Sequence, residues 1–238
     1  MDNMVKVLCI IQARLTSERL PNKVLLPLGN TGISLLEHTY QRLQKAHCID
    51  EVIFAIPDSS SNEPLARYLK EKAIPFFAGS EDDVLERFWR TAKEYNPRFI
   101  VRATCDNPLV DWKLADALVE QLGDYDCISC EDTPLGTAVE VFTMKALDEA
   151  YNNVKEPSWR EHVTPYIWEK KKCKLIKWSD LRFRLTVDET RDFELVSTIY
   201  NDLYEGEPIP NSEVYDYLIN NPSLASSNLQ VHQKTVGE

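Results

Sequence analysis

Apolar runs of strand length alternate with segments of helical spacing along this chain, and that alternation limits its possible folds more than any other feature. Residues 5–13 form a continuous run of mostly β-branched and aliphatic side chains, typical of a strand covered on both faces. Further strands are predicted at residues 51–56, 75–78, 98–103 and 125–129, and helices at 34–46, 63–72, 80–95 and 113–122. Repeated β-α-β units predict an α/β protein, a three-layer α/β/α sandwich with a mostly parallel sheet.

The pattern becomes less regular after about residue 130. Strands are predicted at 138–142, 173–178 and 185–187, and helices at 144–151, 160–170, 193–204 and 212–219, with a kink or break at Pro165. Residues from 221 onward are polar and are expected to fray. We therefore expect one domain over residues 1–222, with an extension around 130–180, and a flexible tail at 223–238.

Charge and composition exclude several classes of function. Lys and Arg total 27 against 38 Asp and Glu, a formal net charge of −11. So acidic a chain lacks the basic face needed to bind nucleic-acid phosphates or anionic membranes. It has no apolar run of about 18 residues and no basic segment at its start, so we expect a cytoplasmic protein without a membrane span or signal peptide. The six cysteines are expected to be reduced.

A basic loop follows the first predicted strand. Arg14, Arg19 and Lys23 stand close together in an otherwise acidic chain, and Ser17 adds a hydroxyl. In open α/β sheets, ligands bind beyond the carboxyl ends of the strands, and Arg and Lys side chains suit phosphate oxygens. The segment is either a phosphate-binding loop that relies on side chains or an ordinary solvated loop. Walker and Rossmann glycine motifs are absent, which disfavours P-loop kinases and NAD dehydrogenases.

Two acidic residues follow other predicted strands. Asp106 comes just after the strand at 98–103, and Asp188 directly follows the strand at 185–187. Two carboxylates that converge beside a triphosphate are what Mg²⁺ requires, because this ion takes one or two protein carboxylates plus phosphate oxygens. The alternative is a turn residue for Asp106 and a helix N-cap for Asp188. Cys127 and Cys130 form a C-x-x-C pair without further zinc ligands at suitable spacing, and we interpret them as buried thiols.

Six segments of the chain form a recognisable set. In order, they are IQARLTSERLPNKVLLPLG, GSEDDVLERFWRTAKEY, VRATCDNPLVD, VEVF, REHVTPYI and LTVDETRDFELV. Taken together they resemble the cytidylyltransferase family of the SpsF type, with CMP-Kdo and CMP-sialic acid synthetases as more distant relatives. The resemblance covers roughly residues 5–200 and includes a basic loop and a D-x-P-L turn. It implies a fold of the nucleotide-diphospho-sugar transferase (GT-A-like) type and a homodimer built in part by the extension.

The resemblance assigns roles to individual residues. It implies catalytic roles for Arg14, Lys23, Asp106 and Asp188, with the two acids as Mg²⁺ ligands. It places Glu140 and His162 on the acceptor side, where Glu140 binds a hydroxyl or amine and His162 is a base, a sugar contact or a structural histidine. The residues expected around the CTP nucleotide are Ala13, Arg14, Ser17, Arg19, Lys23, Arg87 and Thr104.

Four positions depart from the family pattern. Relatives commonly have Gly at Thr16, Asn22 and Cys105, and Asp at Ala138. Thr tolerates a positive φ poorly, so a left-handed Thr16 would alter nucleotide binding. We predict a Mg²⁺-dependent transferase that moves CMP from CTP to a sugar or sugar-acid acceptor in surface polysaccharide biosynthesis and releases pyrophosphate. The alternatives are a glycosyltransferase, disfavoured because Asp106 lacks a D-x-D partner, and a nucleotide-binding regulator without turnover.

Overall fold

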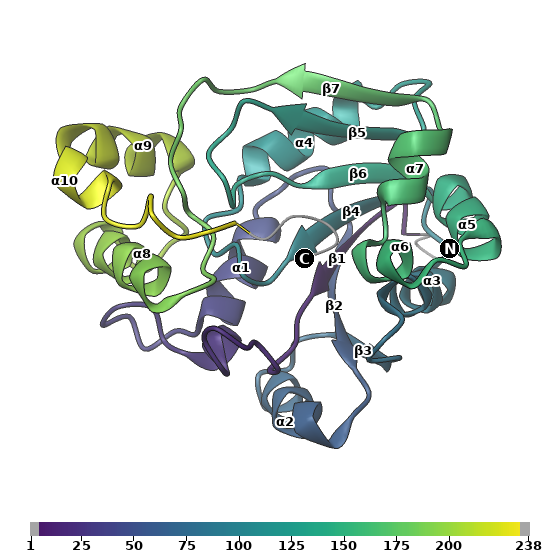
Figure 1. Ribbon diagram of the computed structural model, residues 1–238, viewed down its shortest axis with the longest axis horizontal. Helices are drawn as coiled ribbons and strands as arrows, with labels where there is room; N and C mark the ends of the chain where they lie inside the picture. Colours follow the sequence, from purple (N-terminus) through teal and green to yellow (C-terminus); the bar gives the residue numbers. More distant parts are fainter. Residues whose placement is uncertain (1–4, 234–238) are drawn as a thin grey trace.

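The computed structural model describes residues 5–233, and a single mixed sheet organises it (Figure 1). The sheet has seven strands in the order β3-β2-β1-β4-β6-β5-β7. All neighbouring strands run parallel except β6, which is antiparallel to both β4 and β5. The mostly parallel α/β sheet predicted from the sequence is confirmed. The strands are β1 Val7–Gln12, β2 Glu51–Pro57, β3 Phe76–Gly79, β4 Phe99–Thr104, β5 Cys127–Glu131, β6 Glu140–Thr143 and β7 Cys173–Lys177.

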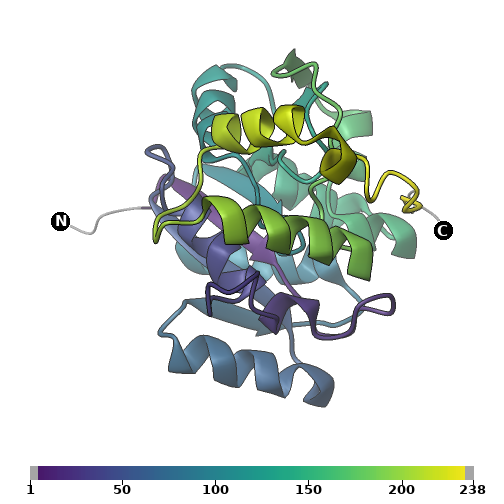
Figure 2. The same ribbon diagram turned by 90° about the vertical axis from the view of Figure 1, so that its left-hand side faces the viewer.

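Helices cover both faces of the sheet. In β1, Val7, Cys9 and Ile11 enter one apolar core while Leu8 and Ile10 enter the other, which explains the unbroken apolar run. The first face carries α1 Leu35–Leu43, α2 Glu63–Glu71, α4 Trp112–Gln121, α8 Thr190–Leu203 and α9 Asn211–Asn220. The second carries α3 Val84–Tyr95, α5 Met144–Asn153, α6 Pro157–His162 and α7 Pro165–Lys170. Figure 2 shows α8 and α9 side by side on the first face.

Two predicted elements differ from the structure near the site. The helix expected at 160–170 begins earlier, at Pro157, and the break expected at Pro165 is confirmed: α6 ends at His162, Val163 has a non-helical φ of 67° and ψ of −54°, and α7 begins at Pro165. The strand expected at 185–187 does not form, and the nearest β-pairing in the described chain is an isolated bridge between Leu135 and Arg184, one residue before this segment. It instead lies extended beside the turn after β4, where Val187 N donates to Asp106 O at 2.8 Å.

The start of α3 also differs in detail. Asp83 is the N-cap, and its carboxylate accepts a hydrogen bond from Glu86 N at 2.8 Å. Ser80, the first residue of the helix expected at 80–95, lies three residues before this cap, and its hydroxyl oxygen accepts a hydrogen bond from Asp83 N at 3.1 Å. Asp83 also forms an ion pair with Arg160 of α6, so the residue that begins α3 also ties two helices together.

The polar C-terminal segment packs onto the domain instead of fraying over residues 222–233. It begins with the short helix α10 Pro222–Ala225. Asn228 is completely buried, and its Nδ2 donates to Arg184 O at 3.0 Å and to Asp192 Oδ1 at 2.8 Å. These long-range side-chain bonds hold a segment whose composition alone indicates a tail. Residues 234–238, the rest of the predicted tail, lie outside the described residues.

None of the helices found within residues 5–233 combines the length and the apolar character needed to cross a lipid bilayer.

Candidate active site

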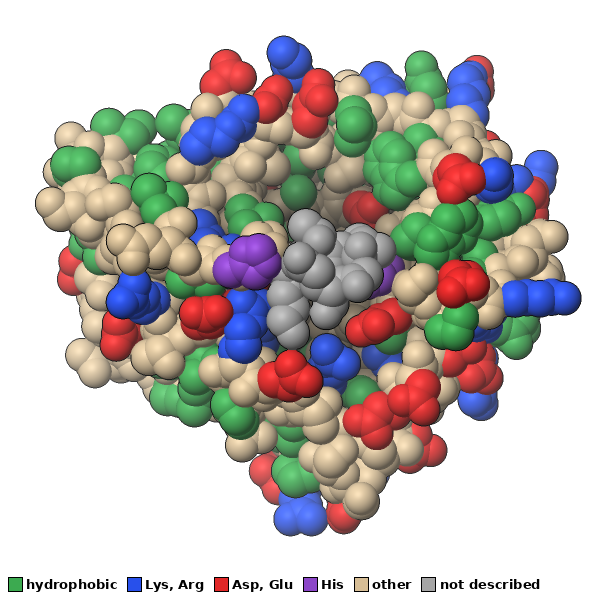
Figure 3. All heavy atoms as spheres, in the orientation of Figure 1, with side chains coloured by type: hydrophobic (Ala, Val, Ile, Leu, Met, Phe, Trp, Pro, Cys, Tyr) green, Lys and Arg blue, Asp and Glu red, His purple; other side chains and the backbone are tan. Residues whose placement is uncertain are grey.

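The basic loop and the two predicted acids meet beyond the carboxyl ends of β1 and β4. Lys23, in the 3-10 helix η1 Lys23–Leu25, is only 8% exposed. Its Nζ donates to Val187 O at 2.6 Å and lies 3.3 Å from Asp188 Oδ1 and 3.7 Å from Asp106 Oδ2. One ammonium group therefore bridges both carboxylates. Figure 3 shows acidic, basic and histidine side chains gathered on this face of the molecule.

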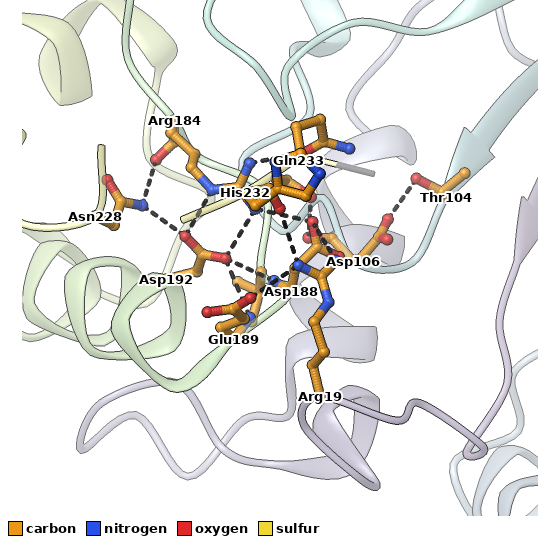
Figure 4. Close-up of polar contacts among 12 residues, drawn as sticks. Arg19, Thr104, Asp106, Arg184, Asp188, Glu189, Asp192, Asn228, His232 and Gln233 are labelled. Atoms are coloured by element: carbon orange, nitrogen blue, oxygen red, sulfur yellow. Dashed lines mark hydrogen bonds and ion pairs between the residues drawn. The ribbon is translucent and has the colours of Figure 1, made fainter. Parts of the chain in front are cut away.

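Arg19 approaches the same acids from the basic loop (Figure 4). Its Nη2 lies 3.5 Å from Asp188 Oδ2, and its Nη1 lies 3.0 Å from Glu189 Oε1. Nη1 also donates to the His232 carbonyl oxygen at 3.1 Å. Two of the predicted phosphate ligands, Lys23 and Arg19, thus have acidic partners within the protein.

Arg14 and Arg87 form a different kind of cationic pair. Arg14 is exposed, whereas Arg87 of α3 is 1% exposed and donates from Nη1 to Ser80 O. Burial and, secondarily, the positive charge of Arg14 lower the pKa of Arg87 to about 10. Across residues 5–233 neither guanidinium has an ion pair, and Arg87 Nε has no hydrogen-bond partner. An anion between the two would relieve their repulsion and satisfy that nitrogen.

Loop geometry positions the cations without a left-handed Thr16. Leu15 N donates to the buried Asn62 Oδ1 at 2.8 Å, and Ala13 N donates to Ala55 O at 3.3 Å. Asn22 has a φ of 58°, which Asn accommodates, and Thr16 and Cys105 are not among the described residues of positive φ. Ser17 N donates to Leu15 O at 2.8 Å, which turns the loop at that residue.

The carboxylate of Asp106 is oriented by its own turn. Thr104 Oγ1 donates to Asp106 Oδ1, and Asn107 Nδ2 donates to Thr104 Oγ1 at 2.9 Å. Thr104, predicted as a nucleotide contact, is thus a neighbour that fixes an acid. Because Val187 N also bonds to the Asp106 carbonyl, the two acid-bearing segments are joined through the main chain.

Residues that the sequence did not assign to the site hold Asp188. Arg184 Nη2 donates to Asp188 Oδ2 at 2.9 Å and also contacts the fully buried Asp192. Burial opposes ionisation of Asp192, but hydrogen bonds from Arg184 and the backbone outweigh it and lower the pKa of Asp192. The available signal was the alternation of two arginines, Arg182 and Arg184, with apolar residues before Asp188. Asn228 gave no signal, because its partners lie far away in the sequence.

The two predicted acceptor-side residues lie apart from this cluster. Glu140 accepts hydrogen bonds from Arg102 Nη1 and Trp168 Nε1, both at 2.6 Å, and from Thr164 Oγ1 at 3.1 Å. Its oxygens are therefore engaged by neighbouring side chains. His162 is partly exposed at the end of α6, and its carbonyl accepts from Thr164 N at 2.8 Å. Within residues 5–233, neither side chain bonds to Asp106, Asp188 or Lys23.

Comparison with known proteins decides the family. The family model described as cytidylyltransferase matches residues 8–217. The chain belongs to the cytidylyltransferase family. The spore coat polysaccharide biosynthesis protein SpsF of Bacillus subtilis is 32% identical over 94% of this chain and 98% of its own length. An uncharacterised protein of Methanocaldococcus jannaschii is 37% identical over 98% of this chain and 99% of its own.

Solved and more distant relatives agree with this membership. A cytidylyltransferase structure from Leptospira borgpetersenii superposes with a TM-score of 0.84 and 27% identity, covering 96% of this chain and all of that one. The 3-deoxy-manno-octulosonate cytidylyltransferase of Syntrophobacter fumaroxidans is 29% identical over 63% of this chain and 56% of its own length. The predicted resemblance and the nucleotidyltransferase fold are confirmed.

The donor set fits a divalent cation shared with a phosphate. No group of three His, Cys, Asp or Glu side chains within residues 5–233 forms a complete metal site. Asp106 and Asp188 supply two carboxylates, and phosphate oxygens would complete the coordination that Mg²⁺ prefers. Because the Lys23 ammonium lies within 4 Å of both carboxylates, the space beside these acids already favours a positive charge. All six cysteines are free thiols, Cys127 and Cys130 included.

Proposed function

We propose that this cytidylyltransferase transfers CMP from CTP to a sugar or sugar-acid acceptor, depends on Mg²⁺ and releases pyrophosphate in surface polysaccharide biosynthesis. One observation carries the proposal: Lys23 touches both Asp106 and Asp188 at the edge where the basic loop ends. A phosphate-binding loop and a pair of carboxylates at one edge are the parts that nucleotidyl transfer needs. The name of the SpsF relative supports the polysaccharide context.

Each part of the site has a task in this reaction. An acceptor oxygen attacks the α-phosphorus, the bond from that phosphorus to the bridging oxygen breaks, and pyrophosphate leaves with the electron pair. Arg14, Arg19 and Lys23 offset the charge on the leaving group. Asp106 and Asp188 would hold Mg²⁺, which when bound polarises the α-phosphate. We assign Arg87 to the nucleotide as well, because its buried Nε lacks a partner within the described residues.

The chemical class of the acceptor decides whether the reaction needs a general base. A hydroxyl acceptor must lose its proton, and we propose that His162 is the base that accepts it. A phosphate or carboxylate acceptor needs no base. Because Arg102, Thr164 and Trp168 engage the Glu140 oxygens, we propose that Glu140 shapes this pocket through those neighbours. We further propose that the enzyme acts in the cytoplasm as a homodimer, which size-exclusion chromatography with light scattering would test.

Release of pyrophosphate from CTP and Mg²⁺ tests the reaction directly. Sugar acids, amino sugars and phosphorylated sugars serve as acceptors, and UTP replaces CTP as the nucleotide control. We expect turnover with CTP and at least a hundredfold lower kcat/KM for Asp106→Asn, roughly the loss expected when one preorganised charge is removed. Asp124→Asn, at an exposed position, is the matched control. Absence of turnover with any nucleotide, or full activity of Asp106→Asn, would contradict the proposal.

Two observations weaken the alternative of a regulator without turnover. This alternative rests on the departures at Thr16, Cys105 and Ala138, and neither Thr16 nor Cys105 has a positive φ among the described residues. Asn22 does require one, and Asn adopts the left-handed region at little cost. Calorimetry that finds CTP binding without pyrophosphate release would restore the alternative.

A further inference from the structure

Asp188 is held by a residue outside the basic loop. Arg184 Nη2 donates to Asp188 Oδ2 at 2.9 Å, closer than the 3.5 Å that separates the same oxygen from Arg19 Nη2. We propose that Arg184 is a positioning residue that fixes the Asp188 carboxylate for the metal, and that the C-terminal segment fixes Arg184. This inference rests on the proposed function, because it takes Asp188 as a metal ligand.

The guanidinium of Arg184 is itself immobilised. It is 5% exposed and forks onto the fully buried Asp192, with Nε 2.8 Å from Oδ1 and Nη2 3.1 Å from Oδ2. A bidentate pair of this kind sets the plane of the guanidinium and leaves little freedom to rotate. The same Nη2 that contacts Asp192 also reaches Asp188, so the plane fixed by Asp192 determines where Asp188 Oδ2 lies.

Asp192 also fixes the main chain at Asp188. Its Oδ2 accepts from Asp188 N at 2.9 Å and from Glu189 N at 3.1 Å, in the capping box that begins α8. One buried carboxylate therefore controls both the backbone of Asp188 and, through Arg184, its side chain. A helix N-terminus fixed in this way presents the acid at a constant place.

Lys23 and Arg19 cannot provide this support once nucleotide is bound. Both belong to the basic loop, and triphosphate oxygens would compete with the acids for their charges. Arg184 is enclosed and paired with Asp192, so it stays on Asp188 in either state. Residues that hydrogen-bond to a metal-bound carboxylate orient it and tune its affinity for the ion.

The C-terminal segment completes the support (Figure 4). The buried Asn228 donates to Arg184 O at 3.0 Å and to Asp192 Oδ1 at 2.8 Å. Gln233 Oε1 accepts from Arg184 Nη1 at 2.7 Å. Every nitrogen of the Arg184 guanidinium then has an acceptor, two of them on Asp192 and one on Gln233. Residues 228–233 thus belong to the structure around the metal ligand, although they lie some forty residues beyond it.

Binding of Mn²⁺ to the full chain tests the inference without turnover. Electron paramagnetic resonance measures free Mn²⁺ in the presence of a CTP analogue that cannot release pyrophosphate. We expect Arg184→Lys to bind Mn²⁺ about tenfold more weakly, because an ammonium cannot hold Asp192 and Asp188 together in fixed geometry. Arg182→Lys is the matched control, an exposed arginine two residues away that pairs with Asp132.

A second pair of variants tests the C-terminal contribution and guards against misfolding. We expect Asn228→Ala to weaken Mn²⁺ binding about threefold, with the exposed Asn220→Ala as control. All measurements are made well below the melting temperature, so a purely structural role would lower stability and leave metal affinity unchanged. The inference would be overturned if Arg184→Lys bound Mn²⁺ as tightly as the wild type. If Arg184→Lys does not fold, wild-type Mn²⁺ affinity in Asn228→Ala would overturn it instead. If the wild-type protein binds no Mn²⁺ with nucleotide, the proposed function fails instead.

Discussion

At the scale of single residues, the site divides its cations into two groups. Lys23 and Arg19 contact the acids directly, whereas Arg14 and Arg87 lie near each other and form no ion pair within the described residues. The carboxylates of Glu81 and Asp83 partly offset the positive charge at Arg87, and the charge of Arg14 opposes it. A bound triphosphate with a divalent ion would suit both groups, because the ion would provide positive charge beside the acids and the phosphates would accept hydrogen bonds from the cations.

Removing the bridging ammonium tests this arrangement. Lys23→Met keeps the length of the side chain but leaves Asp106 and Asp188 without the shared cation, so we expect the free energy of unfolding to fall by about 2 kcal/mol. Mg²⁺ should then raise the melting temperature of the variant more than that of the wild type. Thermal unfolding with and without Mg²⁺ measures both effects. Lys93→Met, which breaks the surface pair with Asp148, is the control, and an equal Mg²⁺ effect in both proteins would contradict the argument.

A buried histidine gives the protein a defined loss of stability in mild acid. His38 is 1% exposed, and burial, aided by Arg42, lowers its pKa from 6.5 to about 4. The unfolded chain then takes up the proton first, so the stabilisation is complete above pH 6.5 and is lost as the pH falls toward 4. The loss amounts to roughly 3 kcal/mol over this window. Urea unfolding at several pH values should show it.

His38→Gln should flatten that pH dependence, and the exposed His47→Gln should preserve it. Glu37 affects stability over a lower pH range. Hydrogen bonds from Lys72 and Tyr68 outweigh its burial and lower its pKa from 4.5 to about 2, so its contribution is lost only between those values. A slope between pH 6.5 and 4.5 that persists in His38→Gln would show that another group is responsible.

At the scale of secondary-structure elements, the start of α3 is tied to α6 through Asp83 and Arg160. Asp83 both caps the helix and pairs with Arg160, at 2.6 Å, so Asp83→Ala should cost about 2 kcal/mol in the free energy of unfolding. Ser80→Ala should cost less, roughly 0.5 kcal/mol, because it removes only a bond to the cap residue. Asp83→Ser retains a capping oxygen and separates the cap from the ion pair in urea unfolding. Equal losses for Ser80→Ala and Asp83→Ala would contradict this order.

The elements that local pattern governs were predictable from the sequence. The run ending at Ala13 and the periodic helices on both faces follow from apolar spacing, since each strand or helix carries its own burial pattern. The segment before Asp188 was wrongly predicted as a strand because its apolar residues are buried against the turn at Asp106 and not in the sheet. The division between α6 and α7 was predictable from Pro165, because proline cannot continue a helix, whereas the positive φ of Val163 just before it has no signature in the sequence.

The acids and cations of the candidate site were predictable from the sequence, but the residues that hold them in place were not. Arg19, Lys23, Asp106 and Asp188 follow strands or precede turns, and strand ends of a parallel sheet converge in space. Arg184 and Asn228 act through side-chain hydrogen bonds to partners far along the chain, for which the sequence has no local signature. Glu140 was assigned to the acceptor from family resemblance, and its engagement by Arg102 and Trp168 appears only in three dimensions.

At the scale of the whole molecule, segments from both ends of the chain converge on the site. Lys23 bonds to Val187 O, Arg19 reaches Glu189 and the His232 carbonyl, and Asn228 secures the segment between them. The basic loop, the segment that carries Asp188 and the C-terminal segment are therefore joined by direct hydrogen bonds. A domain connected in this way should unfold as one cooperative unit that includes residues beyond 222.

Truncation after Ser227 tests that cooperativity. Deleting residues 228–238 removes the buried Asn228 and leaves the Arg184 carbonyl and Asp192 Oδ1 each short of a hydrogen bond, so we expect a loss of about 2 kcal/mol. Urea unfolding should still show a single transition, shifted to lower concentration. Leu229→Ser, at a side chain that is 60% exposed, should stay within about 0.5 kcal/mol of wild type. A frayed tail could be deleted without effect, so unchanged stability of the truncated chain would mean that these buried contacts contribute nothing to the fold.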